Sequence, residues 1–261
     1  MVVITSENRD VIIDAVRGMY SHLARQPQDE FHFATGRFAC EYVGYSADEL
    51  DPIPPGALES FAGVAHPFIA DVIRPGQTVL DVGSGSGTDA LIASRIVGLE
   101  GEVIGLDMTS AMREKLERNA REMGATNVRT LDGNAEEIPL PDTSVDVVTS
   151  NGVLNLVPDK ESAIREIYRV LRPGGKIQIS DIVVEIPPSE ACRAKPELWA
   201  ECIVGAVTKD QYLETLAKAG FEDLEILQRV DYFSASPSDE TKKVASGFNA
   251  HAIVITGVKP A

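Results

Sequence analysis

The sequence predicts an α/β protein with a doubly wound, mainly parallel sheet of seven strands. From residue 78 onward, short apolar runs typical of buried parallel strands alternate with amphipathic stretches of helical spacing. Each crossover between parallel neighbours is expected to be right-handed. Closely spaced glycines follow the first apolar run, between residues 82 and 88. This turn places a candidate ligand site at the carboxyl edge of the sheet.

The predicted elements divide the chain into two parts. Residues 1–75 form an N-terminal lid, with an amphipathic helix at residues 9–25 and loops and short helices at residues 30–68. Residues 76–261 form the ligand-binding domain, with an insertion at about residues 185–207. Its expected strands are residues 78–82, 103–107, 128–131, 144–149, 176–184, 224–230 and 250–258. Its expected helices are residues 90–97, 110–123, 160–171 and 208–219, with Ser110 as an N-cap and Gly124 as a stop.

Composition narrows the class of protein and of partner. The 261 residues are 44% hydrophobic and 25% charged, as in soluble globular proteins. The net charge of −16 disfavours nucleic acid as an acceptor. No apolar run reaches the ~18 residues of a membrane span, and no signal peptide is evident, so a cytoplasmic protein is expected. The three cysteines are too few and too irregular for a disulfide framework or a CxxC zinc site, and no metal site is expected.

The glycine turn is built on an alternating pattern. Gly83, Gly85 and Gly87 follow an acid, Asp81, and the absence of side chains lets the backbone approach a ligand closely. A dinucleotide fingerprint would need a glycine at position 88, which is a threonine. The pattern resembles motif I of the class I S-adenosylmethionine-dependent methyltransferases. The alternative is a tight glycine turn that binds nothing.

This resemblance implies a Rossmann-like fold with S-adenosylmethionine as cofactor. In that family the loop, here Asp81, Gly83, Ser84, Gly85 and Gly87, cradles the amino-acid end of the cofactor. No Tyr-x-x-x-Lys pair occurs in the chain, which removes the usual catalytic pair of short-chain dehydrogenases, the main enzyme alternative on this fold.

Further candidate cofactor residues follow the next three strands. Asp107 lies 107 − 87 = 20 residues after the last glycine, where an acid can accept hydrogen bonds from ribose hydroxyls, and Met108 is next to it. Asn134 and Ala135 occupy a segment that resembles the adenine-binding segment of the methyltransferases, with Asn134 in place of the usual aspartate. Asn151 ends the fourth strand and is expected near the sulfonium. The alternatives are a solvent-exposed strand-end carboxylate at Asp107 and a loop cap at Asn151.

Several strings resemble the arsenite methyltransferases more closely. They are residues 105–109, 150–160 and 201–206, and the resemblance runs from about residue 78 to residue 221. The family methylates trivalent arsenic held by cysteine thiolates, which are natural ligands of this soft element. Cys202 matches one arsenic-binding cysteine of the family. At the position of another such cysteine, this chain has Gly152. Cys40 lies in the N-terminal region, where a further family cysteine occurs, so the resemblance makes Cys202 and Cys40 candidate catalytic residues.

The main interpretation is an S-adenosylmethionine-dependent methyltransferase that acts on a small-molecule acceptor. One alternative is a true arsenite methyltransferase that uses Cys202 with Cys40. An alternative of another class is a cofactor-binding regulatory protein without transfer activity. Under the main interpretation His32, Tyr42 and His66 are candidate base or binding residues. Trp199 either forms a wall of the acceptor pocket or packs the insertion.

Overall fold

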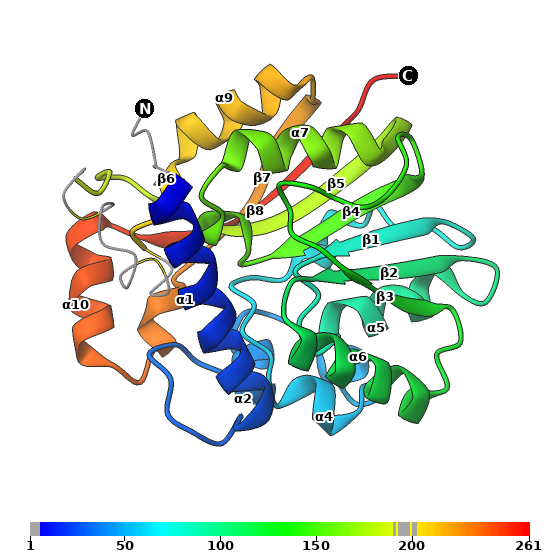
Figure 1. Ribbon diagram of the computed structural model, residues 1–261, viewed down its shortest axis with the longest axis horizontal. Coiled ribbons are helices and arrows are strands. Elements are labelled where there is room, and N and C mark those ends of the chain that lie inside the picture. The colour runs from blue at the N-terminus through cyan, green and yellow to red at the C-terminus, as the bar shows by residue number, and fades with distance from the viewer. Residues whose placement is uncertain (1–5, 190–191, 193–198, 200–202) are drawn as a thin grey trace.

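The computed structural model describes residues 6–189, 192, 199 and 203–261, and its centre is one twisted sheet (Figure 1). The strand order is β3-β2-β1-β4-β5-β8-β7. Neighbours from β3 to β5 run parallel, whereas β8 runs antiparallel to both β5 and β7. The strands are β1 (Thr78–Val82), β2 (Glu102–Asp107), β3 (Val128–Asp132), β4 (Val145–Asn151), β5 (Leu171–Val184), β7 (Glu222–Val230) and β8 (His251–Val258). The predicted doubly wound seven-stranded sheet is therefore confirmed.

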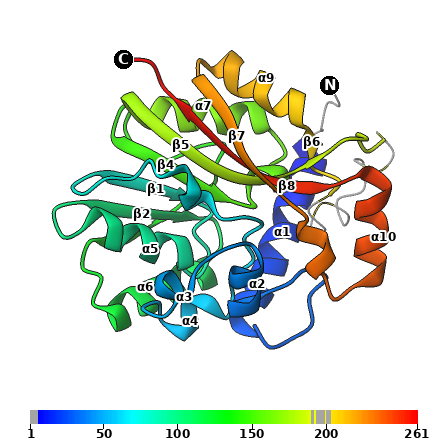
Figure 2. The ribbon, with the colours of Figure 1, turned by 180° about the vertical axis from the view of Figure 1, so that it is seen from behind.

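Helices cover both faces of the sheet, as a doubly wound fold requires. The helices α5 (Thr88–Val97) and α6 (Ser110–Met123) pack on one face, and α7 (Lys160–Val170) and α9 (Lys209–Ala219) pack on the other (Figures 1 and 2). Successive strand residues point to opposite faces. Val79 accordingly belongs to the apolar cluster under α5 and α6, whereas Leu80 belongs to the cluster under α7 and α9.

The N-terminal part packs beside α6 and across the carboxyl ends of the strands. It consists of α1 (Ser6–Arg25), α2 (Gly36–Tyr42), α3 (Ala47–Leu50), α4 (Pro55–Leu58) and the 3-10 turn η1 (Pro67–Ala70). Lys115 of α6 fastens this part to the domain, although its side chain is only 2% exposed. Its Nζ lies 2.6 Å from Ser60 Oγ, 3.3 Å from the Ala24 carbonyl oxygen and 2.7 Å from a Glu59 carboxylate oxygen.

Some elements differ from the sequence prediction. The N-cap of α6 is Thr109 rather than Ser110, because helical geometry already begins at Ser110. A two-residue strand, β6 (Val207–Thr208), adds to β5, and β5 itself begins at Leu171, before the Pro-Gly-Gly turn expected to precede it. Helix α10 (Asp239–Phe248) was not predicted, nor were the 3-10 turns η2 (Leu154–Leu156) and η4 (Tyr232–Ala235).

Two expectations concern the insertion and the membrane. About half of the expected insertion lies outside the described residues, which omit positions 190–191, 193–198 and 200–202. Within the described part of the chain, no helix has both the length and the apolar character needed to cross a bilayer.

Candidate cofactor and acceptor site

The glycine loop joins β1 to α5 and turns sharply. Gly83, Gly85 and Gly87 have φ values of 73°, 51° and 103°, in the left-handed region that favours glycine. A Cβ atom on Gly83 would run into Val153, and one on Gly87 would run into Leu116. The glycines therefore allow both the turn and the close approach of neighbouring side chains.

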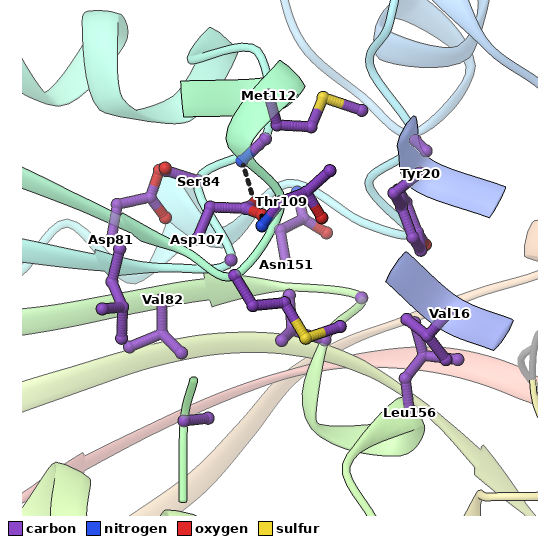
Figure 3. Close-up of a pocket in the computed structure, with 18 of the residues that line it drawn as sticks. Val16, Tyr20, Asp81, Val82, Ser84, Asp107, Thr109, Met112, Asn151 and Leu156 are labelled. Carbon is purple, nitrogen blue, oxygen red and sulfur yellow. Dashed lines mark hydrogen bonds between the residues drawn. The ribbon is translucent and has the colours of Figure 1, made fainter. Parts of the chain in front are cut away.

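One cavity lies beyond the carboxyl ends of β1, β2 and β4 (Figure 3). Nine of the ten residues predicted to bind the cofactor line it. They are Asp81, Gly83, Ser84, Gly85, Asp107, Met108, Asn134, Ala135 and Asn151. The tenth, Gly87, does not line the cavity and instead caps α5 against Leu116. Figure 3 shows Val16 and Tyr20 of α1 facing Leu156, on the side of the cavity away from Asp81.

Asp107 presents a fixed carboxylate at the end of β2. Its Oδ1 accepts a hydrogen bond from the Thr109 backbone N–H at 2.8 Å, and its Oδ2 accepts one from the Gly85 N–H at 2.9 Å. The pKa of Asp107 is raised above its usual value because the carboxyl group is buried. These hydrogen bonds and nearby Arg113 offset part of that rise. The carboxylate thus borders the cavity in a defined orientation, as recognition of ribose hydroxyls requires.

Two buried polar atoms in the cavity wall have no partner among the described residues. They are Oδ2 of Asp81, a residue only 2% exposed, and Oγ of Ser84, a residue 7% exposed. Buried polar atoms are normally hydrogen-bonded, and an unpaired one costs about 1–3 kcal/mol. Burial first, and then the charges of Asp89 and Asp107, raise the pKa of Asp81 well above its usual range. Both residues line the cavity, although these two atoms are themselves buried.

The Asn134 side chain is partly used within its own loop. Its Oδ1 accepts hydrogen bonds from the backbone N–H groups of Glu136 at 2.8 Å and Glu137 at 3.1 Å. The Nδ2 group is therefore the part of this side chain that can serve a ligand. Glu136 also lines the cavity, and its carboxylate binds Arg9 of α1 and the Asp159 N–H.

The Asn151 side chain joins the sheet to the N-terminal part. Its Oδ1 accepts hydrogen bonds from the N–H groups of Val64 at 2.8 Å and Ala65 at 3.4 Å. Its Nδ2 donates to the Ala65 carbonyl at 2.9 Å, to Asp89 Oδ2 at 3.0 Å and to Tyr45 Oη at 3.1 Å. Asn151 thus borders the cavity and also holds the segment around Val64 in place.

Sequence reasoning missed Asp89 and Tyr45, which belong to this network. Asp89 lies in the first turn of α5, lines the cavity and is 6% exposed. It accepts a hydrogen bond of 2.5 Å from the Tyr45 hydroxyl, and burial raises its pKa. An acid two residues after the last loop glycine was the available signal for Asp89, whereas no local pattern marks Tyr45.

The structure does not assemble an arsenic site from the cysteines that it describes. Cys40 is fully buried in α2 and does not line the cavity, and burial and the charge of Asp89 raise the pKa of its thiol. Gly152 has a φ of 73°, and a Cβ atom there would lie 3.0 Å from a Val64 methyl group. Cys202 lies outside the described residues. Among the described residues, no group of three or more His, Cys, Asp or Glu side chains could hold a metal ion.

The remaining candidate residues lie away from the cavity wall. The His66 Nε2 lies 3.0 Å from a Glu49 carboxylate oxygen, and the Tyr42 hydroxyl donates to the Asp231 carbonyl oxygen at 2.8 Å. The His32 ring packs edge-on against a neighbouring aromatic ring. The Trp199 ring is buried, with Lys160 Nζ 5.3 Å from its centroid. Trp199 does not line this cavity; it lines a separate pocket together with Lys160 and Tyr212.

The strand order, the glycine loop and the strand-end acid together define a class I methyltransferase fold. Comparison with known proteins agrees: the family described as "Methyltransferase domain" matches residues 73–220, and the chain belongs to this family. Its cofactor is S-adenosylmethionine.

Similar proteins refine the resemblance. The chain is 39% identical over 210 residues to the arsenite methyltransferase of Halobacterium salinarum, covering 80% of this chain and 51% of that relative. It is 38% identical over 224 residues to the mouse arsenite methyltransferase, covering 76% and 60%. The structure is similar to an arsenic(III) S-adenosylmethionine methyltransferase from Chlamydomonas reinhardtii, with a TM-score of 0.64, 30% identity and coverage of 87% and 75%. The chain spans about half the length of the halobacterial relative.

Proposed function

We propose that this chain transfers a methyl group from S-adenosylmethionine to a small-molecule acceptor. The observation that carries the proposal is the shared cavity. It combines a glycine-rich loop, a strand-end carboxylate and two buried polar atoms that lack partners among the described residues. When bound, the cofactor supplies a methyl group that is attached to a sulfonium sulfur. Once the methyl group is transferred, this sulfur becomes a neutral thioether.

Each predicted cofactor residue has a place in this proposal. Asp107 accepts hydrogen bonds from the ribose hydroxyls, with Met108 beside it. The Asn134 Nδ2 and the Ala135 backbone N–H serve the adenine ring. Asp81, Gly83, Ser84, Gly85 and Asn151 surround the amino-acid end, and Gly87 shapes the loop. All of these residues except Gly87 line one cavity, which supports these roles.

The acceptor end is proposed to be largely apolar. Val16 and Tyr20 of α1 face Leu156 of η2, and Phe61 adds a further apolar wall (Figure 3). Residues 1–75 act as a lid in this proposal, because side chains of α1 form part of the cavity wall. The protein's contribution is then to align the nucleophile with the methyl–sulfur bond and to exclude water. A small acceptor with an apolar body fits such walls.

The test is the formation of S-adenosylhomocysteine by purified protein. The protein is incubated with S-adenosylmethionine and, in separate reactions, a hydroquinone, an aromatic thiol or arsenite. We expect product with at least one acceptor and much weaker cofactor binding in Asp107→Asn. A wild-type protein that binds neither S-adenosylmethionine nor S-adenosylhomocysteine would contradict the proposal.

Arsenite is the second candidate acceptor, and the names of the similar proteins favour it. Two observations weigh against the usual thiolate site. Gly152 has a positive φ and little room for a side chain, and the thiol of Cys40 is buried. Arsenic binding would therefore depend on Cys202. Arsenite-dependent product formation that is lost in Cys202→Ser but kept in the matched Cys192→Ser control would support this candidate. Equal activity in both variants would exclude a thiolate role for Cys202.

A further inference from the structure

Asp89 is a buried acid that the predicted cofactor contacts do not use. It projects from the first turn of α5 into the cavity wall, where its Oδ1 accepts from Tyr45 at 2.5 Å and its Oδ2 accepts from Asn151 at 3.0 Å. Both donors are neutral groups. They fix the carboxylate in one orientation without neutralising its charge.

No cation of the described residues pairs with this carboxylate. The groups that face it are Tyr45 before α3, Asn151 of β4, Cys40 of α2, His66 before η1, Glu49 of α3 and Asp81 of β1. The nearest histidine pairs with Glu49 instead, and across the described part of the chain no Lys, Arg or His nitrogen lies within 4 Å of Asp89. Buried charges are normally paired, so this wall favours a ligand that brings a positive charge.

The second observation is the neighbouring Asp81. Its Oδ2 is buried, has no partner in the described structure and belongs to the same wall. The strand order places Asp81 and Asn151 on the β1–β4 side of the cavity, whereas Asp107 and Asn134 follow β2 and β3. If the nucleoside occupies the β2–β3 side, the amino-acid end extends toward Asp89.

We propose that Asp89 recognises the α-ammonium group at the amino-acid end of S-adenosylmethionine, and that Tyr45 and Asn151 hold the Asp89 carboxylate in position. This inference rests on the proposed function, because it presumes cofactor binding in this cavity. Tyr45 acts as a positioning residue through Asp89. Its ring also packs on His66, with centroids 4.2 Å apart, which ties the N-terminal part to the same carboxylate.

Two ligands separate this role from a structural one. S-adenosylhomocysteine has the amino-acid end, whereas methylthioadenosine has the same nucleoside without it. Calorimetry would measure both dissociation constants for the wild type and for Asp89→Asn, in which the Tyr45 hydroxyl can turn and accept from the new amide. We expect Asp89→Asn to bind S-adenosylhomocysteine about 10- to 100-fold more weakly, as for loss of a hydrogen bond to a charged group. Methylthioadenosine should change by less than about 2-fold.

Asp107→Asn is the matched control, because both ligands carry the ribose and both should bind more weakly. An equal loss of both ligands in Asp89→Asn, or no loss at all, would overturn the inference. A wild-type protein that binds neither ligand would overturn the proposed function itself. Binding of both ligands by the wild type with an unchanged Asp89→Asn would overturn the inference alone.

A second variant tests the positioning role of Tyr45. The Tyr45 hydrogen bond lowers the pKa of Asp89, so Tyr45→Phe should raise it and shift the fall in S-adenosylhomocysteine affinity at acidic pH to a higher pH. Methylthioadenosine binding should keep the same pH profile in both proteins. A Tyr45→Phe profile that coincides with the wild type for S-adenosylhomocysteine would remove Tyr45 from the inference.

Discussion

Replacement of the buried Lys115 by methionine should destabilise the protein substantially. The change removes the hydrogen bonds that the Lys115 ammonium donates to Ser60 and to the Ala24 carbonyl oxygen. Each hydrogen bond to a charged group contributes about 1.5–3 kcal/mol to stability. Its ion pair with Glu59 adds less, because the Glu59 side chain is 50% exposed and water screens it. Methionine has a similar length and fills the same channel. The methionine variant also avoids the cost of burying a charge, which offsets part of this loss, so we expect a net loss of about 2–3 kcal/mol.

Urea unfolding followed by circular dichroism would measure this loss, and the melting temperature should fall by roughly 5–10 °C. The matched control is Lys218→Met, which removes an ion pair of 2.9 Å to Glu214 between side chains that are 66% and 62% exposed. That change should stay within about 0.5 kcal/mol. A loss below about 1 kcal/mol for Lys115→Met, or equal losses in the two variants, would refute the reasoning.

Three more changes have defined outcomes. Gly152→Cys should lower the unfolding free energy by about 1–3 kcal/mol, because Gly152 has a positive φ that a cysteine adopts only with strain. The control is Gly247→Ala at a helical site with open space around it, which should not lower the unfolding free energy. Equal effects of the two changes in chemical denaturation would contradict this. Burial raises the pKa of Asp181 to about 6, so the native state binds the extra proton and stability should fall by about 1.4 kcal/mol between about pH 5 and pH 8. Asp181→Asn should remove that fall, and an unchanged pH profile would argue against it. In the native protein an alkylating reagent should modify the partly exposed Cys192 and should modify the buried Cys40 only after unfolding. Peptide mass mapping would detect both modifications. Rapid modification of Cys40 would show that its burial is transient.

Local patterns carried most of the sheet prediction. The parallel strands lie between helices on both faces, so their residues are apolar in unbroken runs that stand out in the sequence. Direction is not encoded in such a run, and the antiparallel course of β8 depends on its pairing with β5 and β7. Helix α10 buries only the small side chains of Thr241 and Ala245, so it lacks the large buried apolar residues that mark α6 and α7 in the sequence.

The position of a residue at the cavity was predictable where its place at a strand end decides that position. Asp107 follows directly from its place after β2, and the structure holds its carboxylate against the glycine loop. The role of Asp89 depends on Tyr45, which is 44 positions away, and on Asn151. Lys115 likewise becomes buried only because Ser60 and Ala24 fold over it. Such roles arise from tertiary contacts that no window of sequence contains.

The charges around the cavity connect recognition of the methyl donor with that of its product. Asp81 and Asp89 raise each other's cost of ionisation in a buried wall, and burial raises the pKa of both. Under the proposed function, S-adenosylmethionine brings a sulfonium charge in addition to its ammonium group, so it offsets more of this cost than its product does. Methyl transfer to a neutral acceptor removes the sulfonium charge from beside the acids. The same carboxylates therefore favour the methyl donor over S-adenosylhomocysteine, because the product carries one positive charge fewer.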